Sequence, residues 1–420
     1  MIRTAALLLS FAIAAPVQMA QSQTAADQFH PKHGLNFDIW VQWMDTGDML
    51  AIPGFLDLYP DWRSHVSPAA IQNLPAQGFD FARLPMDPAP LLALGPGPRQ
   101  DGLIDQIGID ADLVQSAGLK VIVDMHTFPR PNEIWGVDNI LADPAKFAAY
   151  TILIGKIAGR LNGMDPTRTA FEPMNEPTTD CDAIWGDATP KWPAQLAALH
   201  AEARSHAPNL PLVLTGACWG GAEGLAALDP ATLQDDNVIW SFHSYTPFLF
   251  THQGADWTEG LNSVLRHLPY PPTLLTADTA RDLARDAARR AKAENITTDP
   301  PATQANLMRA FADYRQTADG QVADAAKLVA DWADAHHIPH NRLLLGEFGA
   351  NRAPEDRAPE DTEADTASRA RFLRAKALSA SALGIGWAVW SWSGSFGIAD
   401  DTAARHPDPR ICRALGLPCH

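Results

Sequence analysis

Short apolar segments recur along the chain, and each is followed by a longer stretch with helical periodicity. The segments are rich in β-branched and aromatic residues, which favours strands. Strands that alternate with helices are typical of βα units on a parallel sheet. The sequence predicts eight strands, at residues 35–40, 79–86, 120–126, 169–177, 210–216, 238–245, 342–349 and 386–392.

Eight βα units within 420 residues fit a (β/α)8 TIM barrel of the α/β class better than an open sheet. We expect a single catalytic domain over residues 26–420, with a helical insertion between the sixth and seventh strands. The clearest helix spans residues 144–161 and is amphipathic. Two helical stretches, residues 279–294 and 304–335, form the insertion. Arg and Asp alternate in the first of them, which indicates a solvated, salt-bridged face.

The first residues have the features of a secretory signal. A basic start at Arg3 precedes an apolar run over residues 5–17, and polar residues follow it. We expect a signal peptide at residues 1–25, with cleavage between Ala20 and Ala26, and therefore export to the periplasm or the medium. A permanent membrane anchor is the alternative, but the run is shorter than the ~20 residues that span a bilayer.

The chain has four cysteines, all after this segment. An even number in an exported chain predicts two disulfides. We favour Cys181 with Cys218 and Cys412 with Cys419, although spacing alone does not fix the pairing. No C-x-x-C pair or Cys/His ligand spacing occurs, so we expect no metal and no cofactor.

A formal net charge of −17 argues against nucleic-acid binding and against anionic membrane surfaces. With 46% hydrophobic and 19% charged residues, the composition is that of an ordinary globular protein. A neutral substrate is compatible with this charge, and we expect a monomer.

Two predicted strands end on a glutamate. Asn175, Glu176 and Pro177 close the fourth, and Glu347 lies near the end of the seventh, between two glycines. A strand interior disfavours such residues. Two carboxyl groups held across one pocket are the minimum for glycoside hydrolysis, one as acid and base, the other as nucleophile or water activator. A polar turn is the alternative for each motif alone.

Chemistry-bearing residues also fall at other strand ends, where TIM barrels hold their active sites. In this order the motifs resemble those of glycoside hydrolase family 5, within the clan of retaining (β/α)8 glycosidases, from Gly34-Leu35-Asn36 to Trp392. The matching residues are Arg83 in R-L-P, His126 in V-D-M-H, Asn175-Glu176-Pro177, His243-Ser244-Tyr245, Gly346-Glu347-Phe348-Gly349 and Trp390 in W-A-V-W-S-W.

The resemblance implies that Glu176 is the general acid/base and Glu347 the nucleophile. It also implies a sugar-binding shell of Arg83, His126, Asn175, His243, Tyr245 and Trp390. Taken singly, each of these has a structural alternative: a buried salt bridge, a core histidine or a packed tryptophan. Glu172 shares the inward parity of Glu176, so we expect it deeper in the barrel as a structural partner, with an exchange of the two roles as the alternative.

Thirteen tryptophans are present, and many fall in segments expected on the catalytic rim. Aromatic rings hold extended sugar chains, whereas ordinary packing accounts for many of these residues. We select Trp219, after the fifth strand, and Trp257, after the sixth, as substrate-binding residues.

These features predict an endo-type retaining β-glycosidase, with a β-1,4-glucan as first choice of substrate. β-Mannan, β-1,3- or mixed-linkage glucan and an exopolysaccharide remain open, because the residues after Arg83 and His126 depart from typical cellulases. A non-catalytic carbohydrate-binding barrel is the alternative of another class. An esterase or metallopeptidase is disfavoured because neither G-x-S-x-G nor H-E-x-x-H occurs.

Overall fold

The structure is a computed structural model of the chain. The residues it describes are 23–38, 66–128, 134–255, 257–258, 260–352, 365–399 and 406–418.

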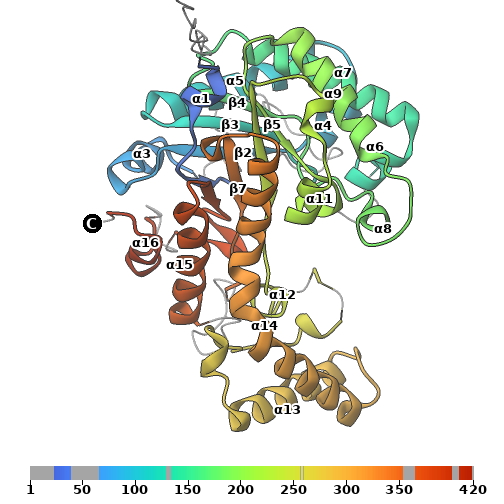
Figure 1. Cartoon of the computed structure of the whole chain (residues 1–420), viewed down its shortest axis with the longest axis vertical. Coiled ribbons are helices and arrows are strands. Elements are labelled where there is room, and N and C mark those ends of the chain that lie inside the picture. Colours follow the sequence, from blue (N-terminus) through green and yellow to red (C-terminus); the bar gives the residue numbers. More distant parts are fainter. Residues whose placement is uncertain are drawn as a thin grey trace, which may run out of the picture.

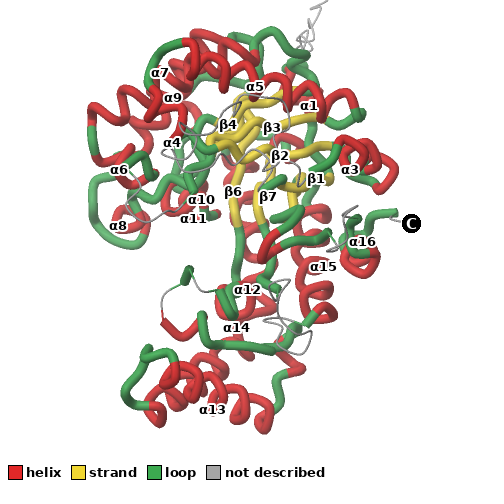
Figure 2. Tube along the Cα trace, turned by 180° about the vertical axis from the view of Figure 1, so that it is seen from behind, coloured by secondary structure: helices red, strands yellow, loops and turns green. Residues whose placement is uncertain are grey.

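Eight parallel strands form a closed barrel in which each strand pairs with the next and β8 pairs with β1. Figure 2 shows the strands gathered inside a layer of helices. The predicted (β/α)8 barrel is therefore confirmed. The strands are β1 (His33–Asn36), β2 (Phe81–Met86), β3 (Lys120–Met125), β4 (Thr169–Glu172), β5 (Leu212–Thr215), β6 (Val238–His243), β7 (Leu343–Glu347) and β8 (Gly386–Val389).

Every strand but β2 ends earlier than predicted. The strand β4 stops at Glu172 instead of residue 177, because Pro173 has no backbone N–H for the ladder and Glu176 has φ 29°. Likewise β6 and β8 stop before Tyr245 and Trp390. Several of the expected strand-end residues therefore lie in the loops that follow. The first predicted strand was placed too late, since β1 begins at residue 33, and residues 39–40 lie outside the described part.

The predicted helix at residues 144–161 is confirmed as α7 (Pro144–Leu161). Its first turn is capped by Asp143, which accepts hydrogen bonds from two backbone N–H groups. The other barrel-side helices and short turns are α1 (Ala25–Phe29), α3 (Pro68–Asn73), α4 (Ala89–Leu94), α5 (Pro98–Ser116), α6 (Val137–Ala142), α8 (Cys181–Ile184), α9 (Trp192–His206), α10 (Ala217–Gly220), α11 (Ala222–Ala226), α15 (Thr366–Ala382) and α16 (Pro409–Ala414).

The insertion between β6 and β7 contains α12 (Phe248–Thr251), α13 (Ala277–Ala293) and α14 (Pro300–Ala335). Figure 1 shows α13 and the start of α14 projecting away from the barrel, while the rest of α14 runs beside α15. Five of the seven alanines of α13 are buried, and its Asp and Arg side chains pair three residues apart on the exposed face. This confirms the predicted helical insertion and its salt-bridged surface.

The end of the barrel at which the strands begin is filled by apolar side chains that include one from each of β2 to β8. On β1 the position belongs to Gly34, and the Phe81 ring occupies the space where a side chain would stand, 2.2 Å from the place of a Cβ. The helix α1 covers this end, with Phe29 edge-on to Phe81 at 6.4 Å. The filling residues are Ala26, Phe29, Phe81, Ile122, Ala170, Val213, Ile239, Leu344 and Ala388.

Two residues further along each strand, the same inward parity carries a different kind of side chain. The apolar layer is followed by a mainly polar one, which holds two of the candidate residues, Arg83 and Trp390. The second layer consists of Asn36, Arg83, Asp124, Glu172, Thr215, Ser241, Gly346 and Trp390.

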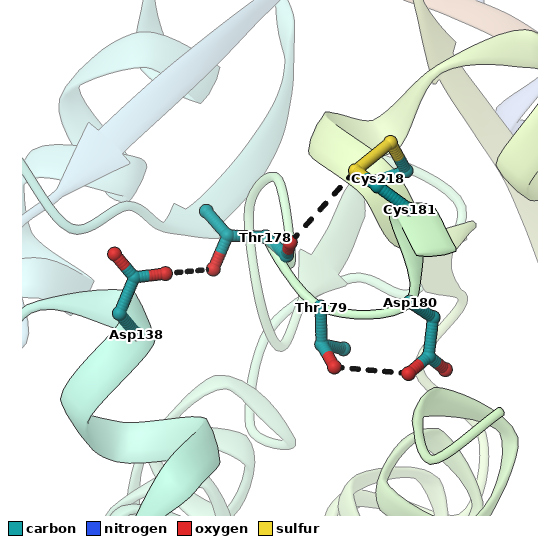
Figure 3. The surroundings of a disulfide bond; sticks show 6 residues. All are labelled: Asp138, Thr178, Thr179, Asp180, Cys181 and Cys218. Carbon is teal, nitrogen blue, oxygen red and sulfur yellow. Dashed lines mark hydrogen bonds between the residues drawn. A yellow bond between two sulfur atoms is a disulfide. The ribbon is translucent and has the colours of Figure 1, made fainter. Parts of the chain in front are cut away.

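The disulfide between Cys181 and Cys218 is confirmed (Figure 3). Cys419 lies outside the described residues, so the second pairing stays a prediction. Among the helices of the described ranges, none combines the length and the hydropathy needed to cross a bilayer.

We expect Gly34→Ala to lower the free energy of unfolding by about 1–3 kcal/mol, because the added methyl group would overlap the Phe81 ring. Urea unfolding measures this effect. Gly163→Ala is the matched control: no atom lies within 4 Å of its added Cβ, so stability should change by less than about 0.5 kcal/mol. Equal effects of the two changes would contradict the packing described.

Candidate active site

One buried guanidinium, that of Arg83 on β2, faces three buried carboxyl groups. Its Nε lies 2.7 Å from Glu172 Oε2, and its two terminal nitrogens lie 2.7 Å from Glu347 Oε1 and 2.9 Å from Asp124 Oδ2. Burial acts to lower the pKa of Arg83, but the three carboxylates raise it well above the usual value. The arginine is therefore a permanent cation at the centre of the site.

The three carboxyl groups cannot all be ionised easily against one cation. Burial raises the pKa of Asp124 to about 7, and it raises the pKa of Glu172 as well, with Arg83 opposing both shifts. Glu172 binds Arg83 with both oxygens and is fully buried. It lies at the depth where we expected a structural partner.

Glu347, at the end of β7, has both carboxylate oxygens engaged. Arg83 donates to Oε1 at 2.7 Å and the Tyr245 hydroxyl donates to Oε2 at 2.8 Å. Burial raises the pKa of Glu347 and the charge of Arg83 opposes the shift. Both donors stabilise the ionised carboxylate, and together they fix its orientation.

Glu176 lies in the loop after β4, and its environment differs. Its Oε1 is 2.7 Å from His243 Nδ1, and no guanidinium of the described residues bonds it. Its side chain is 23% exposed, against 4% for Glu347. Burial raises the pKa of Glu176 to about 7, and it lowers the pKa of His243 to about 4. At neutral pH the histidine is therefore neutral, and the carboxyl is close to half protonated.

Glu176, His243 and Glu347 meet at one point. An oxygen of each carboxyl and a nitrogen of the ring all lie within 4.8 Å of one another. Three such groups also match a metal-ligand set, but the Arg83 guanidinium at 2.7 Å already supplies positive charge to Glu347 and disfavours a second cation. The arrangement suits two differently tuned carboxyl groups that act on one bond, one as proton donor and the other as nucleophile.

A second chain of contacts lies beside the carboxyl pair. His126 Nδ1 is 3.0 Å from Asp124 Oδ2, and its Nε2 is 3.2 Å from Asn175 Nδ2. The pKa of His126 is lowered to about 4 by burial, so we assign Nδ1–H as the donor to Asp124 and Nε2 as the acceptor. Arg83 donates to Asn175 Oδ1 at 2.7 Å, which fixes the amide with its NH2 toward His126. The Trp390 ring stacks on His126, with 5.3 Å between centroids.

The two selected tryptophans lie outside this cluster, and each is 54% exposed. The Trp219 N–H donates to the Pro177 carbonyl at 3.0 Å, so this residue stands next to Glu176. The Trp257 ring is 6.0 Å from Phe396, which in turn lies 5.6 Å from Tyr245. Both indoles therefore offer accessible aromatic surface near the carboxyl pair.

The structure thus brings eight of the ten candidate residues into one connected cluster, and it places Trp219 and Trp257 at the rim. Sequence reasoning missed Asp124 and Asn36, which bond Arg83 directly. Their signal was the strand period: Asp124 precedes His126 by two residues, and Asn36 ends β1 with the same parity. Phe128, which stacks on His126 at 4.6 Å, was also missed.

Curated relatives were found by sequence. Cellodextrinase A of Ruminococcus flavefaciens is 28% identical over 191 residues, which are 45% of this chain and 54% of that protein. Endoglucanase C of Acetivibrio thermocellus is 26% identical over 205 residues, 48% of this chain and 56% of that protein. The chain matches about half the length of these relatives.

Solved structures share the fold along nearly the whole chain. A structure described as an endoglucanase superposes with TM-score 0.64 at 19% identity, covering 93% of this chain and 99% of its own. Cel5A of Thermotoga maritima, in complex with cellobiose, superposes with TM-score 0.62 at 20% identity, covering 94% and 100%. These likenesses establish the fold alone.

The family model described as "Cellulase (glycosyl hydrolase family 5)" matches residues 45–395. That match takes in every candidate site residue and all strands but β1. The chain therefore belongs to glycosyl hydrolase family 5.

Proposed function

We propose that this protein is a retaining β-glycosidase that works by double displacement, with Glu347 as nucleophile and Glu176 as general acid/base. The observation that carries the proposal is the carboxyl pair itself, two oxygens within 4.8 Å in different environments. Retaining glycosidases hold their carboxyl groups about 5–5.5 Å apart, whereas inverting enzymes need about 6.5–9.5 Å to admit a water molecule.

In the first step a Glu347 oxygen attacks the anomeric carbon while the glycosidic C–O bond breaks. The leaving oxygen takes the proton of Glu176, and a glycosyl ester of Glu347 is formed. In the second step Glu176, now a carboxylate, takes a proton from water as the water oxygen attacks the same carbon. The ester bond breaks, and both glutamates return to their first states.

The contacts of each carboxyl suit its role. Arg83 and Tyr245 donate to Glu347 and so favour the ionised form that a nucleophile requires, against the burial that raises its pKa. Among the described residues, the neutral His243 is the hydrogen-bond partner of Glu176, and the raised pKa of Glu176 keeps a proton available near neutral pH.

The residues beside the pair would hold the sugar ring at the cleavage point. Asn175 presents its NH2 group, an arrangement that suits a hydrogen bond to the 2-hydroxyl. Trp390 offers a flat face for the ring, and its stacking on His126 fixes that face. Trp219 and Trp257 would bind sugars further along the chain.

For the substrate, we propose endo-type action on a β-1,4-glucan. The names of the relatives, cellodextrinase and endoglucanase, support this choice. A structural neighbour from Thermotoga maritima was solved with mannotriose, which keeps β-mannan as an alternative. Another neighbour is a cellulose synthase subunit Z from Clostridioides difficile, which keeps an exopolysaccharide as another. A non-catalytic sugar-binding barrel is the candidate of a different class.

We further propose that the protein is exported and acts as one catalytic domain on a neutral polysaccharide. The Cys181–Cys218 disulfide supports export, because such bonds persist in oxidising compartments.

The first test is hydrolysis of a panel of soluble β-glucans, β-mannans and aryl β-glycosides, with the anomer of the first product followed by NMR. We expect the β-anomer. The control is Glu347→Gln, which should abolish turnover yet keep sugar binding by calorimetry, because the amide keeps the shape without the nucleophile. An α-anomer would contradict retention, and sugar binding without turnover in the wild-type protein would favour the non-catalytic alternative.

The pH profile tests the role of Glu176. Because burial raises its pKa to about 7, kcat/KM on a β-glucan should be retained below this value and fall as pH rises through about 7. An unperturbed glutamate would place the fall near ~4.3. The control is an aryl glycoside whose phenol leaves without protonation. Because its first step needs no acid, its kcat/KM should not show this fall as pH rises through about 7. The same fall in Glu176→Gln would contradict the assignment.

Trp219→Ala and Trp257→Ala should each raise KM for long oligosaccharides by roughly 3- to 10-fold, with little effect on small aryl glycosides. The expected size follows from the ~0.5–1.5 kcal/mol of an aromatic contact. Steady-state kinetics on oligosaccharides of increasing length measures it. Trp185→Ala is the matched control, since Trp185 is 69% exposed and has no assigned role. An equal rise of KM in all three variants would contradict the substrate-binding roles of Trp219 and Trp257.

A further inference from the structure

We propose that the Cys181–Cys218 disulfide positions the acid/base for leaving-group protonation, by locking the loop after β5 against the loop after β4 that carries Glu176. This inference rests on the proposed role of Glu176. The disulfide joins residues 37 apart in the sequence, and Figure 3 shows it bridging two separate segments.

The two loops are joined by backbone as well as by sulfur. The Cys218 N–H donates to the Thr179 carbonyl at 2.9 Å, and the Trp219 N–H donates to the Pro177 carbonyl at 3.0 Å. Pro177 directly follows Glu176 in the chain. The disulfide and these two hydrogen bonds therefore join residues 177–181 to Cys218 and Trp219, directly after the acid/base Glu176.

The other end of the same loop forms the wall behind the Glu176 side chain. Gly220 lies so close that a Cβ there would stand 3.6 Å from Glu176 Cγ and 3.7 Å from His243 Nδ1. The next residue, Gly221, forms a parallel bridge with His243. A displacement of the loop after β5 would thus reach both Glu176 and its histidine partner.

The backbone of this unit adopts conformations that side chains disfavour. Glu176, Asp180, Cys218 and Trp219 have φ values of 29°, 66°, 53° and 64°, in the left-handed region. Residues other than glycine hold such angles only where their surroundings enforce them. A covalent bond between the two loops is a direct means of enforcement.

The loop after β4 has anchors of its own that do not involve the disulfide. In the loop after β4, Asp180 Oδ2 accepts from the N–H groups of Lys191 and Trp192 at the start of α9, at 2.7 and 2.6 Å. Thr178 bonds Asp138 on α6 (Figure 3). Loss of the disulfide should therefore release Cys218, Trp219 and Gly220 while the loop after β4 stays in place.

The expected consequence is specific to one part of the reaction. With the wall at Gly220 loosened, Glu176 loses its fixed direction and water reaches it. Substrates whose leaving group needs a proton would then react more slowly, whereas those with a good leaving group would not.

The test is the double variant Cys181→Ala/Cys218→Ala. We expect kcat/KM on cello-oligosaccharides, or on the best substrate found, to fall at least about tenfold, with a change of less than about twofold on an aryl β-glycoside of an acidic phenol. The alkaline limb of the pH profile should move to lower pH, because hydration favours the charged carboxylate. The control Cys412→Ala/Cys419→Ala removes the two remaining cysteines and should leave the ratio of the two substrates unchanged.

Hydrogen exchange gives a readout independent of turnover. The backbone amide of Trp219, which bonds the Pro177 carbonyl, should exchange faster in the double variant than in the wild-type protein, while those of Lys191 and Trp192 stay protected. Unchanged exchange, or an equal loss on both substrates, would overturn the inference. A wild-type protein that cleaves no glycoside would instead count against the proposed function, and exchange alone would then decide whether the disulfide holds the loop.

If the double variant does not fold, the native protein can be treated with dithiothreitol. The disulfide then takes up two electrons and two protons to give two thiols, while the dithiol is oxidised to its cyclic disulfide. The same changes in substrate ratio and exchange are expected, and their absence after confirmed reduction would also overturn the inference.

Discussion

The burial of the Arg83 guanidinium is the constraint on which the site depends. A fully buried cation is tolerated only where anions and hydrogen-bond acceptors surround it, and here they come from β1, β3, β7, β4 and the loop after β4. Each acceptor is thereby held in one orientation. The nucleophile candidate Glu347 is one of these acceptors, so its position follows from the electrostatics of the barrel interior.

The two carboxyl groups owe their different properties to different kinds of support. Glu347 ends a strand, and its oxygens are fixed by a cation and a phenol. Glu176 lies in a loop, at a left-handed backbone position, and is held by neighbours that are themselves held by a disulfide. The barrel thus fixes one partner directly and the other through its loops, as expected where proton affinity must differ between similar groups.

The barrel and the helix at residues 144–161 could be predicted because they depend on local periodicity, which the sequence carries directly. The prediction that Asn175 and Glu176 lie on a strand was wrong, because a proline and a left-handed backbone position end β4 before them. Asp124 and Asn36 were missed because their contacts with Arg83 depend on the register between neighbouring strands, which the local pattern of one strand does not give. The exposure of Trp219 and Trp257 depends on how loops fold, which the pattern does not encode.

The packing of Phe81 against Gly34 beneath α1 closes one end of the barrel, with the filling side chains fully buried. Within the described part of the chain, this end therefore gives sugar and water no path to the carboxyl pair, and both would come from the opposite end of the barrel. In a double displacement, the group that departs would occupy the path by which water arrives. The sealed floor would then keep the two half-reactions in order by access alone, since water reaches the intermediate only after the first product has left.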